Sequence, residues 1–238
     1  MAPSERNLQD TVDDLLDQAW EAHSPNEQST LARQALMLDH GAIDGYVILA
    51  LLAETNPEKV ALLREAARRG EVHEKEGIER PFMRALHNLA LVLWTCGDKE
   101  EAVQLVDRML QLNPNDNQGA RYLALSWHPV LGNWSRVEKI LKKCQGEVRT
   151  EHLYAYCLDC VRRGVNAEEA LNAAMVVNPY VPAMLLSQSP QLLDQTSTSA
   201  VFGSEEEAAT YAAFSLDAWA SVPVALGWLR GAIRRARQ

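Results

Sequence analysis

The chain has 238 residues, of which 47% are hydrophobic and 23% are charged, enough apolar material for one or two domains with a core. Its net charge of -9 argues against a general nucleic-acid binder, because neutralising phosphates needs a positive surface. The longest apolar run, Tyr46 to Ala53, is far shorter than the roughly 18 residues of a membrane span, and the first six residues do not form the apolar stretch of a signal peptide. We therefore expect a soluble cytoplasmic protein that binds neither nucleic acid nor membrane.

Along most of the chain, apolar residues recur at the three-and-four spacing of a helix face. The first such stretch begins at Asn7, and others follow at about 27–38, 42–54, 57–69, 81–95, 99–111, 117–128, 134–144, 150–163 and 167–177. Helix ends are indicated by Asn-Pro pairs at 56–57, 113–114 and 178–179 and by five glycines: Gly41, Gly70, Gly97, Gly132 and Gly164. No stretch alternates strictly enough to predict a strand. The sequence thus predicts an all-α protein.

After Pro179 the helical pattern is interrupted. Residues 187–203 are polar and without period, which predicts a loop or crossover. Ser204, followed by three glutamates, predicts a capping box that begins a helix, and a second helix is expected from about Val222. We expect this pair to cover the end of the preceding helices. The predicted organisation is a helical array over 1–186, a loop over 187–203 and a C-terminal helix pair over 204–238.

The helical stretches also recur at a fixed interval. Residues 88–91 align with 122–125 at an offset of 34, and the Gly-Asp at 97–98 aligns with the Gly-Asn at 132–133 at an offset of 35. A third copy surrounds Ala170, and an earlier one begins at Ala35. Such a period is typical of stacked helical hairpins, because a single hairpin cannot bury its apolar face alone.

The best copy, 83–116, resembles the tetratricopeptide repeat (TPR) family. Its small and large positions follow the family order: Leu86, Leu89, Ala90, Leu93, Gly97, Ala102, Val106, Leu110 and Pro114. The resemblance covers about 25–180 and weakens on either side of this copy; Met109 stands where the family usually has Ala. It implies a right-handed solenoid of helical hairpins with a C-terminal helical cap. The stretch 80–119 is also similar to uncharacterised bacterial TPR proteins, a likeness that implies no activity.

In such a repeat the first helix of each hairpin turns certain side chains into a concave groove. The predicted peptide-binding residues are Arg84, His87, Asn88, Leu91, Gln118, Arg121, Tyr122 and Leu125. Guanidinium groups pair with carboxylates through two hydrogen bonds, so this wall suits an acidic or extended segment. Alternatively, the same residues form pairs within the protein that fix the curvature of the repeats. We expect a non-catalytic adaptor that binds another protein or peptide, without metal or cofactor.

Two other roles stay open. One is a structural subunit that builds an oligomer through its outer face or its C-terminal helices. The other is a metal or redox protein that uses the Cys157/Cys160 pair, with Cys144 and His152 nearby. Packing of the thiols in the core is the simpler interpretation, because a mid-helix CxxC lacks the knuckle of a zinc site.

The basic residues Arg136, Lys139, Lys142 and Lys143 are interpreted as the solvated side of an amphipathic helix. No hydrolase, metalloprotease or phosphate-loop motif occurs, and the acidic runs are explained by helix first turns and solubility. We therefore expect that the protein is not an enzyme.

Overall fold

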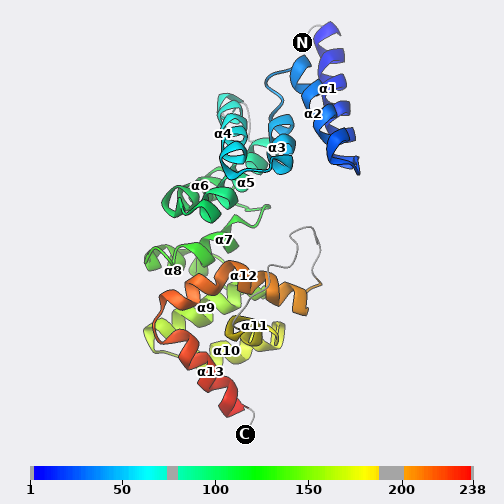
Figure 1. Ribbon diagram of the computed structural model, residues 1–238. Coiled ribbons are helices and arrows are strands. Elements are labelled where there is room, and N and C mark those ends of the chain that lie inside the picture. The colour runs from blue at the N-terminus through cyan, green and yellow to red at the C-terminus, as the bar shows by residue number, and fades with distance from the viewer. Residues whose placement is uncertain (1–2, 74–79, 188–200, 237–238) are drawn as a thin grey trace. The chain divides into compact units, whose positions relative to one another are not determined.

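The structure is a computed structural model that describes residues 3–73, 80–187 and 201–236 (Figure 1). Within these ranges every regular element is an α-helix, which confirms the all-α prediction for the described residues. The helices are α1 (Pro3–Glu21), α2 (Pro25–Leu38), α3 (Ile43–Leu52), α4 (Asn56–His73), α5 (Arg80–Cys96), α6 (Lys99–Leu112), α7 (Ala120–Trp127), α8 (Trp134–Lys143), α9 (Thr150–Arg163), α10 (Ala167–Val177), α11 (Val181–Leu186), α12 (Glu205–Ser221) and α13 (Ala225–Ala236).

The helix bounds follow the sequence pattern closely. Each helical stretch predicted before Pro179 overlaps an observed helix, and the two predicted C-terminal helices are α12 and α13. The short helix α11 was not expected, because six residues give too little periodicity to detect. The predicted loop at 187–203 lies mostly outside the described residues, since 188–200 are not among them.

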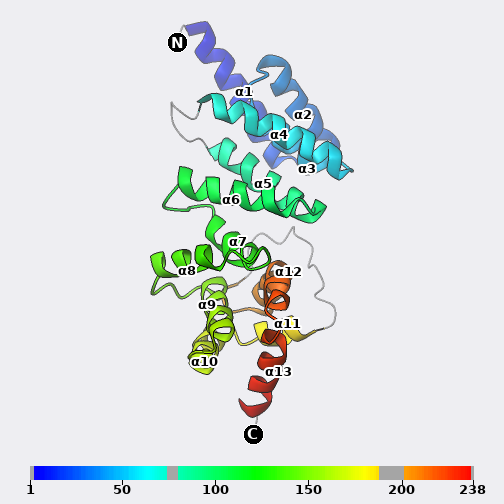
Figure 2. The same ribbon diagram turned by 90° about the vertical axis from the view of Figure 1, so that its left-hand side faces the viewer.

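The chain folds into two compact units, residues 1–120 and 121–238. In the first unit α1 packs with α2, α3 with α4 and α5 with α6, while α2 also packs on α3 and α4 on α5. The first helices of these pairs, α1, α3 and α5, contact one another in order (Figure 2). This succession of neighbours is the packing expected of stacked helical hairpins.

Two ion pairs join α4 to α6 within this unit. Arg64 contacts Glu101 at 2.7 Å, and Arg108 contacts Glu71 at 2.8 Å. Both pairs connect residues 37 positions apart. The two pairs thus fasten α4 to α6, the second helices of two adjacent helix pairs.

The glycines expected at helix ends differ in outcome. Gly41 lies between α2 and α3, but its φ is not positive, so it is not a left-handed helix stop. Gly97, Gly132 and Gly164 have positive φ angles of 95°, 72° and 70° in the turns after α5, α7 and α9, as a left-handed helix stop requires. The prediction for Gly70 is wrong, because this residue lies inside α4. A Cβ there would be 2.2 Å from Cδ2 of Phe82 on α5, so Gly70 is needed for the close approach of the two helices.

The second unit is organised around α9. Its hairpin partner α10 packs on it, and so do α12 and α13 (Figure 1). The core contains Tyr154 of α9 with Tyr211 and Trp219 of α12. The Trp219 indole N–H donates to the Tyr211 hydroxyl at 3.0 Å, so these large side chains are buried with their polar atoms satisfied. Helices distant in sequence thus share one core.

Among the described residues, no single helix is both long and apolar enough to cross a membrane; only α12 and α13 taken together meet that measure, and they are bent by 112°.

Candidate functional site

A cleft of about 650 Å³ lies in the first unit, between α5 and the connection that follows α6. It is lined by Arg80, Met83, Arg84, His87, Leu112, Asn113, Asn117 and Gln118. Three of the predicted groove residues, Arg84, His87 and Gln118, therefore line one cleft. Arg80, Arg84 and His87 fall on one side of α5 because they are separated by three or four residues.

Arg84 is also held from within the protein. One of its guanidinium nitrogens lies 2.6 Å from Oδ1 of Asp44 on α3, and its guanidinium carbon lies 4.7 Å from the centre of the Trp20 ring on α1. Burial raises the pKa of Asp44 above its usual range, although Arg84 acts in the opposite direction. Arg84 thus links three helices of the first unit as well as lining the cleft.

The opposite wall of the cleft is built by a hydrogen-bonded connection. The Asn113 amide donates to Gln118 Oε1 at 2.7 Å, and buried Asp116 accepts from the backbone N–H of Ala120 at 2.7 Å, where α7 begins. Burial lowers the pKa of His87, and Asp116 offsets this only in part, so the imidazole is neutral at neutral pH. The cleft therefore offers neutral donors and acceptors beside two guanidinium groups.

Two predicted groove residues on α5 do not line this cleft. The Asn88 amide donates to the backbone oxygen of Arg84 at 2.8 Å, within its own helix. Leu91 is half-buried, one turn beyond His87 towards the end of α5. Asn88 follows His87 directly and so points away from the side of α5 that lines the cleft, whereas Leu91 lies on that side but one turn further along the helix.

The remaining predicted residues belong to the second unit. The Arg121 guanidinium donates to both carboxylate oxygens of Glu147 at 3.2 and 3.1 Å and lies 4.5 Å from the centre of the Tyr122 ring. The Tyr122 hydroxyl also donates to Glu147. Leu125 is only 2% exposed and packs in the interior. Arg121 and Tyr122 are therefore paired within the protein, as the alternative interpretation of these residues expected.

Glu147 was missed by sequence reasoning, since it lies in the irregular connection between α8 and α9 and has no motif around it. Burial by itself would raise its pKa, but hydrogen bonds from Arg121 and Tyr122 outweigh burial and lower it. Burial, helped by the bond to Glu147, raises the pKa of Tyr122 to about 12. The three side chains form a network with Glu147 ionised at neutral pH.

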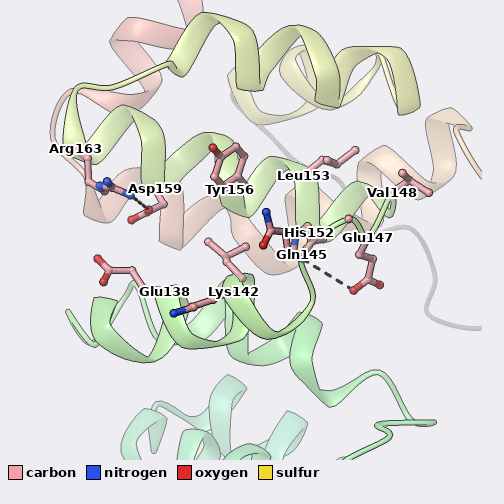
Figure 3. A pocket seen from close by; sticks show the side chains of 12 residues that line it. Glu138, Lys142, Gln145, Glu147, Val148, His152, Leu153, Tyr156, Asp159 and Arg163 are labelled. Atoms are coloured by element: carbon pink, nitrogen blue, oxygen red, sulfur yellow. Dashed lines mark hydrogen bonds and ion pairs between the residues drawn. The ribbon is translucent and has the colours of Figure 1, made fainter.

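A second cleft, of about 500 Å³, runs between α8 and α9 and along their connection (Figure 3). Figure 3 shows Gln145, Glu147 and His152 at one end, and Glu138, Asp159 and Arg163 at the other. His152 is 5% exposed, and its Nδ1 lies 4.0 Å from a carboxylate oxygen of Glu147. Burial lowers the pKa of His152, and Glu147 offsets this only partly.

The cysteines of α9 are part of the core. Cys157 and Cys160 are free thiols with 0% and 2% exposure. Burial, with the neighbouring Cys160, raises the pKa of Cys157 to about 12, and burial also raises the pKa of Cys160. Both thiols are therefore protonated at neutral pH, which makes them poor nucleophiles and poor metal ligands. This agrees with the interpretation that they serve packing.

The proposed metal ligands are not brought together. Within 3–73, 80–187 and 201–236, no group of three or more His, Cys, Asp or Glu side chains is arranged to hold a metal ion. Cys144 is half-buried just after α8.

No family model matches the chain, and neither a curated protein nor a solved structure matches it.

Proposed function

We propose that this chain is a non-catalytic, TPR-like helical-repeat protein that binds an extended segment of another protein in the α5 cleft. In this proposal its helix pairs form a right-handed solenoid, and α12 and α13 cap its C-terminal end. The observation that carries the proposal is that Gln118, from the connection after α6, meets Arg84 and His87 in one cleft on α5, the first helix of a hairpin. That is where stacked hairpins present their ligand surface.

The chemistry of the cleft supports a peptide ligand. An extended backbone offers N–H and C=O groups, which amide side chains such as Asn113, Asn117 and Gln118 can satisfy. Arg80, which is exposed, can pair with a carboxylate of the same segment. Because the cleft is built on helices and a hydrogen-bonded connection, little ordering is needed on binding.

Arg84 is not a suitable residue for testing this proposal. Its removal leaves the buried Asp44 carboxylate without its cation, so a loss of binding would be mixed with a loss of stability. Arg80 and Gln118 are exposed, and the Gln118 side chain accepts a hydrogen bond from the Asn113 amide. These two residues are the better probes.

The experiment is a selection of random twelve-residue peptides on the full chain, followed by titration of the selected peptides. The Arg80→Ala/Gln118→Ala double variant should weaken their binding by about tenfold or more, equivalent to about 1.4 kcal/mol. Circular dichroism and the melting temperature should stay as in wild type. Lys139→Ala, an exposed change on α8, is the control and should leave binding unchanged.

Two results would count against the proposal. One is that no peptide is enriched over a blank surface. The other is that enriched peptides bind the double variant as tightly as wild type, which would place the interaction elsewhere.

A further inference from the structure

The α8–α9 cleft is lined in part by solvent-exposed apolar side chains. Val148 is 65% exposed and Tyr156 is 42% exposed, and both line this cleft. Leu141 and Leu153 lie beside them and are more buried. An apolar recess of this kind gains free energy when a partner side chain fills it.

Each carboxylate that lines the cleft is already paired with an arginine. The pairs are Glu138 with Arg162 at 2.7 Å, Asp159 with Arg162 at 2.7 Å and with Arg163 at 3.4 Å, and Glu147 with Arg121 at 3.1 Å. These acidic groups therefore have little remaining attraction for a cationic ligand.

Lys142 gives the cleft its free positive charge. It is exposed on α8 and lines the cleft, and no carboxylate among the described residues forms an ion pair with it. Lys139, one turn earlier, is exposed as well but does not line the cleft. The rim is thus basic at this point, while the chain as a whole has a net charge of -9.

We propose that the α8–α9 cleft is a second docking site, for a partner segment that places an apolar side chain against Tyr156, Leu153 or Val148, which follow one another along the cleft (Figure 3), and a carboxylate near Lys142. Lys142 attracts the acidic residues of the segment, and the apolar side chains of the cleft bind its apolar residue. This site lies in the other unit and has a different chemistry from the α5 cleft. It therefore does not rest on the function proposed above.

A nucleic acid fits these observations less well. Neutralising several phosphates needs several free cations, whereas this cleft offers Lys142, and the arginines beside it are engaged with carboxylates. A peptide segment with one apolar residue and one or two acidic neighbours needs only an apolar surface and one cation, and the cleft provides both.

The test uses a labelled synthetic peptide of twelve residues with two adjacent leucines flanked by glutamates, titrated into the full chain by fluorescence polarisation. Two matched probes replace the leucines by serine or the glutamates by lysine. We expect saturable binding of the first probe, and binding at least about tenfold weaker for each of the others.

Protein variants then locate the binding. Val148→Ser and Lys142→Glu should each weaken the leucine–glutamate probe by about tenfold, and Lys142→Glu should also improve binding of the lysine probe. The matched controls are Val176→Ser, at an 86% exposed position on α10, and Lys139→Glu on α8. All four positions are exposed, so the fold is not expected to change.

The proposal is overturned if no saturable binding occurs, if the serine probe binds as well as the leucine probe, or if Lys139→Glu acts like Lys142→Glu. The Arg80→Ala/Gln118→Ala variant should bind the leucine–glutamate probe as wild type does. Loss of binding there would assign the probe to the α5 cleft, which would refute this second site and leave the first proposal standing.

Discussion

Glu147 belongs to no sequence motif, yet its carboxylate fixes the positions of several neighbouring side chains. It accepts hydrogen bonds from Arg121 and Tyr122 and lies near His152, so one carboxylate orders residues from α7, α9 and the connection between α8 and α9. Its side chain is 17% exposed. A partly buried carboxylate with two donors is stable as the anion, and its protonation weakens the whole network.

The first prediction concerns this carboxylate and pH. The folded-state pKa of Glu147 is lowered, so its stabilising contribution is present above the unfolded value of 4.5 and is lost as the pH falls through the lower folded pKa. Glu147→Gln should cost about 1–2 kcal/mol at pH 7 and nearly nothing at the acid end. Melting temperatures of both proteins between pH 7 and pH 3 measure this.

The control for that experiment is Glu138→Gln on α8. Its carboxylate is 51% exposed and pairs with Arg162, so the same substitution should change the stability by less than about 0.5 kcal/mol. If the melting temperature of Glu147→Gln falls with decreasing pH as steeply as that of wild type, Glu147 is not the group that stabilises the fold through its lowered pKa.

At the scale of elements, the contact between α4 and α5 depends on the absence of one Cβ atom. Gly70 faces Phe82, which is 1% exposed and therefore has no room to move away. A glycine inside a helix is otherwise unfavourable, because alanine has the higher helix propensity. The close packing of the two helices offsets that cost.

We predict that Gly70→Ala destabilises the chain by about 1–3 kcal/mol, because the added methyl group overpacks a tight contact. Gly227 in α13 is the matched position, since a Cβ there meets nothing within 4 Å and its φ is not positive. Gly227→Ala should stabilise by up to about 1 kcal/mol. Urea unfolding of both variants measures these changes in stability. Equal changes in the free energy of unfolding would show that helix propensity alone governs the two sites.

Helix α12 is fixed at its start by a buried acid. The Ser204 hydroxyl accepts from the Glu207 backbone N–H at 3.1 Å, which confirms the predicted N-cap. The Glu207 side chain, which belongs to the predicted acidic first turn of this helix, is only 9% exposed. Its Oε2 accepts from Thr150, from Asn178 and from the Gly203 backbone at 2.9, 2.9 and 2.8 Å.

Glu207→Gln should therefore destabilise the second unit by about 1–3 kcal/mol, because a neutral amide weakens these bonds and puts donors next to donors. Glu206→Gln, at the exposed neighbouring position, should be almost neutral. Hydrogen exchange of the α12 amides, compared between the two variants, measures whether the start of the helix loosens. Equal protection in both would refute the anchoring role.

At the scale of the whole molecule, the two units differ in how far apart in sequence their contacts are. In residues 1–120 each helix packs mainly on its immediate neighbours. In residues 121–238 the contacts reach further: Ser126 bonds to Ser215 across 89 positions, and Thr150 to Glu207 across 57. Closing long loops before such contacts form slows folding.

Refolding of the full chain should consequently show two stages. Pulse-labelling hydrogen exchange should find the amides of α3 to α6 protected before those of α9 and α12, because local contacts form first. Simultaneous protection in both units, or earlier protection of α12, would contradict this order.

Much of the secondary structure was determined by the sequence alone. Helix bounds, the glycine turns and the Ser204 cap depend on residues within about four positions of one another, and such patterns are visible in a single chain. That Arg84 and His87 share one side of α5 was also within reach, because they are three residues apart, whereas Gln118 reaches the same cleft from the connection between α6 and α7.

Only the tertiary structure decided which of those side chains are already engaged. Arg84 meets Asp44 of another helix, and Arg121 meets Glu147 26 positions away, pairings that no local spacing encodes. The same holds for the recess at Val148 and Tyr156, because exposure depends on what the rest of the chain leaves uncovered. Helices follow from short-range periodicity, whereas partners and clefts follow from the packing of segments distant in sequence.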